Sequence, residues 1–123
     1  MENLIIQQTK ETPEINFNTN GQLLIKGISI PENVTSFYIP LITWIIALGG
    51  NLPGSIHLVF EIEYINTSTT RVFIDLIRQV NLLKEQCPDT TITWKYLKDD
   101  EDIYDLGKDL EYSAKSTFIF ETI

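Results

Sequence analysis

The sequence predicts one α/β domain, in which a mixed β-sheet carries about three helices packed on one face. Three observations predict this fold. Apolar and polar residues alternate over residues 56–65, apolar residues recur at helical spacing over 69–86, and the expected order is strand, hairpin, helix, strand, helix, strand, helix, strand. With 123 residues, of which 43% are hydrophobic, the chain has enough apolar material for a single core.

The first elements are expected to be strands. Residues 1–14 should form a loosely held N-terminal arm with a short strand at 4–6. Two β-rich runs, 15–18 and 23–30, are separated by Asn20-Gly21, a pair that supplies the positive φ of a tight turn. These residues therefore predict a hairpin.

The first helix is expected to start at Pro31-Glu32-Asn33, since proline and an acid suit a first helical turn, and to end before Gly49. Pro40 lies inside this range, so the helix either starts later or bends there. The helix has more apolar residues than one buried face needs. A core stripe takes six of them, and the others should be covered by the N-terminal arm or by another protein: Tyr38, Ile39, Ile42 and Ile46.

The second half alternates strands and helices. In the strand at 56–65, one face should lie in the core with Phe73 and Trp94, namely Ile56, Leu58, Phe60, Ile62 and Tyr64. The helix at 69–86 carries Arg71, Asp75 and Arg78 at helical neighbour spacing opposite its apolar stripe. A strand at 91–97, an acidic helix at 99–114 and a closing strand at 117–123 complete the sheet.

The charge of the chain excludes several partners. Seventeen acids against nine Lys and Arg give a net charge of −8, which disfavours nucleic acid and anionic membrane surfaces as partners.

Cys87 is the only cysteine and no signal peptide or membrane span is evident, so a cytoplasmic location is expected. Both tryptophans, Trp44 and Trp94, are expected to anchor the core.

No residue pattern points to catalysis, a metal or a cofactor. Glu61 and Glu63 share a strand face, but Lys95 could pair with either carboxylate. His57 has no second histidine near it, and a solvated position is expected. The acidic run 99–102 suits the start of a helix, and it lacks the spacing of a calcium loop. An enzyme is therefore the least favoured class.

The junction after residue 65 is the most informative segment, because a strand runs directly into four consecutive hydroxyl residues that open a helix. The first turn of a helix has unpaired N–H groups that favour an anion. From spacing alone, Thr67 and Ser68 are equally good helix caps. A hydroxyl at this place can also be phosphorylated, so both interpretations remain open here.

The sequence resembles the SiaC family of bacterial regulatory phosphoproteins over nearly its whole length. The most specific segment is Tyr64-Ile65-Asn66-Thr67-Ser68, followed by a helix that contains Asp75. Further matches occur in the same order: Pro31-Glu32-Asn33, Trp44 and Thr93-Trp94-Lys95-Tyr96.

The resemblance implies a fold like that of STAS domains and a non-enzymatic signalling function. It implies that a kinase phosphorylates Thr67, with Ser68 the second choice, that a phosphatase reverses this, and that the unphosphorylated form binds and activates a diguanylate cyclase. Ser68 is then expected to cap the helix and Asn66 to form the turn. Partner contacts are expected at Asn66, Ser68, Arg71, Ile39, Ile42 and Ile46, where pairing with a second copy of the chain is the other option. The alternative function is a small structural or ligand-binding domain in which Thr67 and Ser68 only cap a helix.

Overall fold

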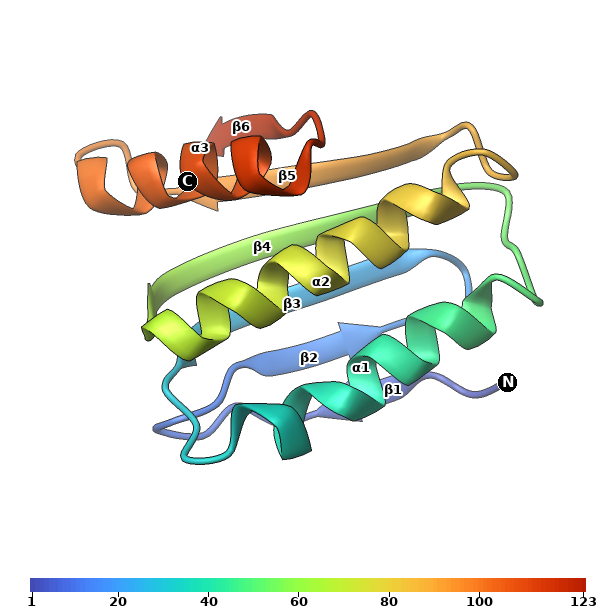
Figure 1. The fold of residues 1–123 in the computed structure, drawn as a ribbon, viewed down its shortest axis with the longest axis horizontal. Coiled ribbons are helices and arrows are strands. Elements are labelled where there is room, and N and C mark those ends of the chain that lie inside the picture. The colour runs from blue at the N-terminus through green and yellow to red at the C-terminus, as the bar shows by residue number, and fades with distance from the viewer.

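The computed structural model describes residues 1–123 and contains a six-stranded sheet in the order β1-β2-β3-β4-β5-β6 (Figure 1). The first two strand pairs are antiparallel and the last three are parallel. The elements follow the predicted order: β1 Leu4–Ile6, β2 Glu14–Phe17, β3 Gln22–Ser29, α1 Val34–Leu48, β4 Ile56–Ile65, α2 Thr67–Leu83, β5 Thr90–Tyr96, α3 Glu101–Ala114 and β6 Ile119–Thr122.

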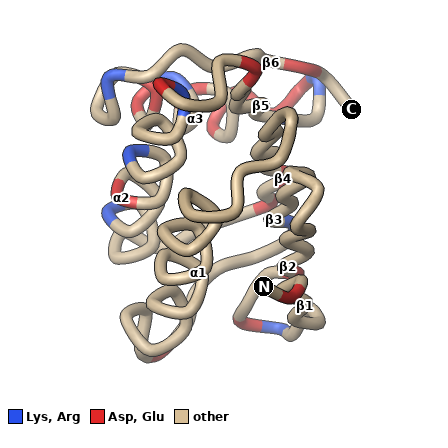
Figure 2. Tube along the Cα trace, turned by 90° about the vertical axis from the view of Figure 1, so that its right-hand side faces the viewer, with Lys and Arg blue, Asp and Glu red and all other residues tan.

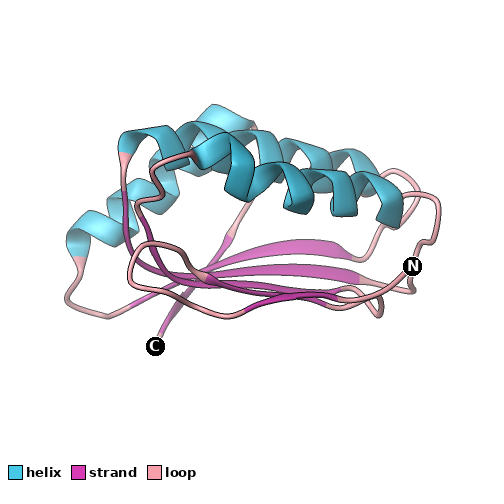
Figure 3. Ribbon diagram, turned by 90° about the horizontal axis from the view of Figure 1, so that it is seen from below, coloured by secondary structure: helices cyan, strands magenta, loops and turns pink.

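All three helices cover the same face of the sheet (Figure 3). Each helix connects one parallel strand to the next, so α1, α2 and α3 all begin at the edge where β3, β4 and β5 end. This mixed α/β architecture confirms the predicted fold class. None of the three helices is both long enough and apolar enough to cross a bilayer.

The core lies between the sheet and the helices and contains 24 buried apolar residues. At its centre, the ring of Phe60 lies 5.0 Å from that of Phe73 on α2 and 5.3 Å from that of Trp94 on β5. The predicted core residues of β4, α2 and β5 are buried together, with the exception of Tyr64. Trp44 is only half-buried. Its ring packs against the core, 5.5 Å from that of Phe17, while its indole N–H donates to the carbonyl of Glu2 at 2.7 Å, so Trp44 lies at the margin of the core and not inside it.

Tyr64 leaves the core because β4 contains a bulge. Gly27 pairs with Ile62, whereas the next residue of β3, Ile28, pairs with Tyr64, so Glu63 is an extra residue. One extra residue reverses the alternation of faces. Tyr64 is therefore 59% exposed on the open face of the sheet, and Ile65 is buried instead.

Asparagine side chains set the starts of two helices. Asn33 caps α1 by accepting a hydrogen bond from the amide of Ser36, so Pro31 and Glu32 precede the helix and do not form its first turn. The helix continues through Pro40, whose missing N–H leaves the carbonyl of Ser36 without its helical donor. Both residues are exposed, so water can take the place of that donor. The α2 helix begins at Thr67, two residues earlier than expected, because Asn66 caps it.

The N-terminal arm is attached to the rest of the fold at several points. Its strand β1 pairs with β2, and the amide of Ile30 donates to the carbonyl of Glu11. The side chain of Asn3 accepts from the amide of Thr19 at 2.9 Å. The arm covers Trp44 but leaves Ile39 and Ile46 of α1 exposed.

Candidate functional site

The β4–α2 junction is organised by Asn66. Its side-chain oxygen accepts from the amide of Thr69 at 3.0 Å, from the hydroxyl of Thr69 at 2.6 Å and from the hydroxyl of Ser68 at 3.1 Å. The backbone amide of Asn66 donates to the carbonyl of Ser29 at 3.0 Å, which joins the end of β4 to the end of β3. Asn66 is therefore the helix cap, and the expectation that Ser68 caps while Asn66 only turns the chain was wrong. Asn, Ser and Thr all favour this position, and only the fold decides among them.

Thr67 is the first residue of α2, and its side chain is exposed. Its hydroxyl has no hydrogen-bond partner in the protein, and Asn66 performs the capping. Ser68 is also exposed, but its hydroxyl donates to Asn66. Of the four consecutive hydroxyl residues, Thr67 is the one whose oxygen is both exposed and unengaged.

Behind this exposed end lies a buried chain of hydroxyl groups. The hydroxyl of Tyr38 on α1 lies 2.6 Å from that of Ser29, which lies 2.9 Å from that of Thr69. All three side chains are fully buried. Burial raises the pKa of Tyr38 well above its ordinary value, so this residue stays neutral.

Sequence reasoning missed this chain and placed Tyr38 among the surplus residues outside the core. Ser29 and Thr69 are separated by 40 residues, so no local pattern marks their contact. The one available signal is that Tyr38 falls in phase with Leu41 and Ile45 on the buried face of α1.

A shallow groove between α2 and α3 extends from Thr67. It encloses about 770 Å³, and its lining includes Arg71, Asp75, Arg78 and Ser113. The guanidinium of Arg78 donates to the carbonyl of Ser113 at 3.1 Å. The predicted pairs of Asp75 with Arg71 and Arg78 do not form ion pairs, which leaves Arg71 exposed one helical turn from Thr67.

The outer side of α1 carries no charge, although the protein has a net charge of −8. Figure 2 shows α1 without an acidic or basic residue along its length, whereas α2 and α3 carry both kinds. Ile39 is 54% exposed and Ile46 58% exposed, with Ile42 partly exposed between them. We name Ile39, Ile42 and Ile46 the α1 stripe.

The open face of the sheet carries a row of alternating charges. Glu14, Lys26, Glu61, Lys95 and Glu121 occupy successive strands in register. Glu61 pairs with Lys26 at 3.7 Å and with Lys95 at 3.6 Å, so the expected pairing with Lys95 is confirmed for Glu61.

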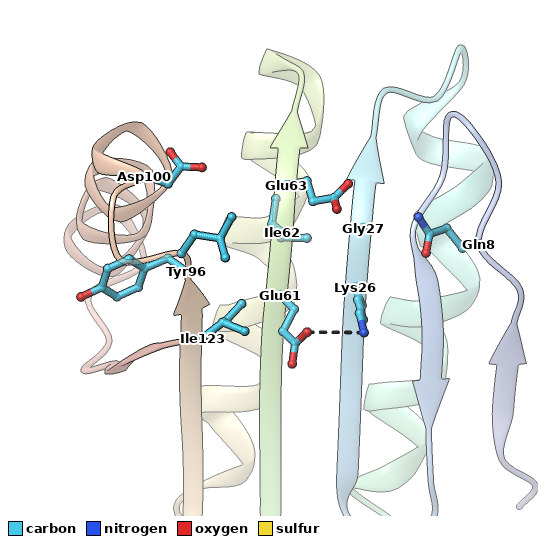
Figure 4. Close-up of a pocket in the computed structure, with 10 residues that line it drawn as sticks. Gln8, Lys26, Gly27, Glu61, Ile62, Glu63, Tyr96, Asp100 and Ile123 are labelled. Atoms are coloured by element: carbon cyan, nitrogen blue, oxygen red, sulfur yellow. Dashed lines mark ion pairs between the residues drawn. The ribbon is translucent and has the colours of Figure 1, made fainter.

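A hollow of about 350 Å³ lies beside this row, with Glu63, Asp100, Gln8 and Ile123 at its border (Figure 4). Asp100 is occupied as the cap of α3, because its carboxylate accepts from the amide of Ile103. The carboxylate of Glu61 is held by its two lysines. Among the three carboxylates that line the hollow, only Glu63 makes neither an ion pair nor a cap contact.

The remaining candidates also have structural partners. The imidazole of His57 lies 2.7 Å from the hydroxyl of Thr91, so this histidine is only partly solvated. Cys87 is buried, and its thiol donates to the carbonyl of Pro53 at 3.6 Å. The acids Glu101 and Asp102 occupy the first turn of α3, as predicted for this acidic run.

Comparison with known proteins identifies the family. The family model for SiaC family regulatory phosphoproteins matches residues 6–123. A protein of Pseudomonas aeruginosa strain UCBPP-PA14 is 22% identical over 122 residues, which cover 98% of this chain and 97% of the relative.

Solved structures share the fold. The structure of SiaC of Pseudomonas aeruginosa is 21% identical, with a TM-score of 0.86 and complete coverage of both chains. A crystal structure of the diguanylate cyclase SiaD in complex with its activator SiaC gives a TM-score of 0.87 at 21% identity, covering 98% of this chain and 99% of the matched one. The match of the family model over nearly the whole sequence shows that this chain belongs to the SiaC family of regulatory phosphoproteins.

Proposed function

We propose that this chain is a non-enzymatic signalling protein that binds an effector protein and releases it when Thr67 is phosphorylated. The observation that carries the proposal is the exposed, unengaged hydroxyl of Thr67 at the start of α2. A kinase needs such a hydroxyl, and a phosphatase needs the same access to remove the phosphate. Because Asn66 caps the helix, Thr67 is free to serve regulation.

The docking surface that we propose joins the start of α2 to α1. The two helices pack against each other, and the contacts of Tyr38 with Ser29 and of Ser29 with Thr69 join the residue before Ile39 to the first turn of α2. The α1 stripe offers an uncharged apolar contact, and Asn66, Ser68 and Arg71 offer polar contacts beside Thr67. A partner that covers the α1 stripe and the start of α2 would bury apolar area from α1, and its affinity would depend on whether Thr67 is phosphorylated.

A phosphate would act on this surface through its charge. It would add nearly two negative charges beside residues that a partner covers. Burying an uncompensated dianion is costly, so the complex should dissociate unless the partner supplies cations at that place. Arg71 is close enough along the helix to attract the phosphate, which would withdraw this arginine from the partner.

By analogy with the complex of SiaD and its activator SiaC, we propose a diguanylate cyclase as the effector. The net charge of −8 argues against nucleic acid and anionic membranes as partners. A second copy of the chain is the other candidate occupant of the α1 stripe. We place the protein in the cytoplasm, since its lone cysteine is a buried thiol and its proposed regulation needs a kinase.

The competing interpretation is a small structural or ligand-binding domain in which Thr67 and Ser68 serve only as caps. Its basis is weakened, because Asn66 fills that role at the observed start of α2. The deciding experiment is the intact mass of protein purified from its native cells, with peptide mapping of any added phosphate. A phosphate on Thr67 supports the switch. Its absence under every growth condition, together with equal effector affinity of phosphorylated and unphosphorylated protein, would refute it.

A further inference from the structure

The exposed face of α2 carries a row of charges that no other part of the protein neutralises. Arg71, Asp75 and Arg78 are all exposed, and none of them forms an ion pair. The guanidinium of Arg78 donates one hydrogen bond to the carbonyl of Ser113, which leaves the charge of this arginine uncompensated. We name Arg71, Asp75 and Arg78 the α2 row.

The sign of the α2 row is opposite to that of the protein as a whole. The row has two arginines and one aspartate, whereas the chain has a net charge of −8. Acidic residues lie on the neighbouring helix α3, yet none of them forms an ion pair with an arginine of α2 across the groove. The two arginines are therefore available to acidic groups of another molecule.

The spacing of the row matches a helix. Arg71 and Arg78 are seven residues apart, which corresponds to about 10.5 Å along the helix axis, and Asp75 lies between them. A partner helix that lies along α2 also presents one side chain in each turn of about 5.4 Å, so three of its side chains match the row. On an extended strand, side chains of one face recur about every 6.6 Å, and three of them span about 13 Å. The row therefore fits a helix better than a strand.

Apolar side chains beside the row provide contacts for such a helix. Leu82 follows one turn after Arg78 and is 64% exposed. Ile74 is half-buried and lines the groove of about 770 Å³ between α2 and α3. Aliphatic contacts of this kind contribute affinity, while the order of the charges determines which helix fits.

We propose that the α2 row selects a partner helix with the complementary order of charges: an acid opposite Arg71, a base opposite Asp75 and an acid opposite Arg78. The helix would belong to the effector, because Thr67 lies one turn before Arg71 and the row continues the exposed face that begins at Thr67. The inference rests on the proposed function. It extends the docking surface along α2 to Asp75 and Arg78 and specifies the charge pattern of the partner.

Phosphorylation of Thr67 would alter the first position of the row. A phosphate one turn before Arg71 would pair with its guanidinium, so this arginine would no longer attract an acid of the partner. The remaining negative charge of the phosphate would repel the same acid. A helix that the row selects should therefore also be a helix that phosphorylation releases.

The test uses two synthetic peptides, each stabilised as a helix and labelled for fluorescence anisotropy. One peptide carries Glu, Lys and Glu at the spacing of the row. The other carries Lys, Glu and Lys at the same places, and the two share their leucines and their length. Binding of each peptide is measured to the wild type, to the triple variant Arg71→Glu with Asp75→Lys and Arg78→Glu, and to Lys84→Glu.

Lys84→Glu is the matched control. Lys84 is exposed at the end of the same helix and lies outside the row. Its substitution lowers the net charge by two, and the triple variant lowers the net charge by the same amount. The comparison therefore separates the order of the charges from the total charge.

The wild type and Lys84→Glu should bind the Glu-Lys-Glu peptide at least tenfold more tightly than the Lys-Glu-Lys peptide, and the triple variant should show the reverse preference. The total charge of the protein would favour the Lys-Glu-Lys peptide in all three cases, so non-specific attraction cannot produce the expected order. Phosphothreonine at position 67 should weaken binding of the Glu-Lys-Glu peptide at least tenfold. Should the triple variant fail to fold, Arg71→Glu alone should weaken that binding about threefold or more.

A preference that stays the same in the triple variant, or no binding of either peptide to the wild type, would overturn the inference. Self-association of the wild type that the triple variant loses would assign the row to a second copy of the chain, which would also overturn it. The affinity for the effector is measured separately with phosphorylated and unphosphorylated protein. Equal effector affinities would refute the proposed function, while the peptide preference would still support the row. Effector binding that depends on phosphorylation but is as tight in the triple variant as in the wild type would support the proposed function and overturn the inference.

Discussion

Replacing Asn66 with alanine should lower the free energy of unfolding by about 2 kcal/mol, about twice the effect of removing an ordinary cap. The cap hydrogen bond to the amide of Thr69 contributes about 1 kcal/mol. The same oxygen also accepts the buried hydroxyl of Thr69 at 2.6 Å, and exchanging this short contact for the longer one to the carbonyl of Ser29, at 3.2 Å, should cost up to about 1 kcal/mol more. Asn33 is the matched control, since it caps α1 through one exposed contact, and Asn33→Ala should cost about 1 kcal/mol.

Thr67→Ala completes the comparison. Its hydroxyl makes no hydrogen bond in the protein and alanine favours a helix, so the change should stay within about 0.5 kcal/mol of the wild type. Urea denaturation followed by far-UV circular dichroism measures all three variants, and each kcal/mol should correspond to about 4 °C in the melting temperature. If Thr67→Ala were as destabilising as Asn66→Ala, Thr67 would be the cap and the main structural support for the switch would be lost.

Four further predictions follow from the site and the core. By calorimetry, Thr67→Ala should keep the affinity for the effector, while Thr67→Asp or the phosphorylated protein should bind at least tenfold more weakly, which corresponds to about 1.4 kcal/mol; equal affinities would contradict the switch. Ile46→Glu should change the melting temperature by no more than about 2 °C, since the side chain is 58% exposed, but it should weaken effector binding or self-association. If neither effector binding nor self-association changes, the α1 stripe is not part of an interface. Gly107→Ala should destabilise the fold by about 1–3 kcal/mol in urea titrations, because the added carbon would lie 2.5 Å from the indole of Trp94, and a neutral effect would mean that α3 moves freely away from the sheet. Burial raises the pKa of Tyr38 and so disfavours the phenolate in the folded state; its contribution to the free energy of unfolding is therefore complete below pH 10 and is lost as the pH rises above 10. Tyr38→Phe should reduce the loss of stability at alkaline pH. An unchanged dependence of the free energy of unfolding on pH would contradict the burial of this hydroxyl.

Regular patterns made most of the fold predictable. The alternation over residues 56–65 located β4 at its observed bounds, and the pair Asn20-Gly21 marked the hairpin turn, in which Gly21 has a φ of 101°. The bulge at Glu63 was not predictable in the same way, because Ile62 and Tyr64 both fit a period of two. Only the pairing with β3, which the local sequence does not encode, reveals the extra residue.

The candidate site was predictable in part. The resemblance to the SiaC family singled out Thr67, and helical spacing singled out Ile39, Ile42 and Ile46. The capping residue could not be assigned from the sequence, because Asn, Thr and Ser have similar preferences for the N-cap position. In the fold, the backbone amide of Asn66 donates to the carbonyl of Ser29, and this contact places Asn66 at the cap. The phase of Tyr38 with Leu41 and Ile45 marks its buried position, but the partner of its hydroxyl could not be predicted, since Ser29 belongs to another element.

The common starting edge of the three helices determines where a new negative charge can be tolerated. Each helix N-terminus carries a partial positive charge from its aligned peptide dipoles, and α1, α2 and α3 present theirs along the same side of the molecule. The acids at the start of α3 already lie in this favourable potential. A dianion on Thr67 would enter the same potential, so the folded protein itself should tolerate the modification despite its net negative charge. The electrostatic penalty would then fall on the protein covering that edge, which allows a single modification to change an association without unfolding the molecule that carries it.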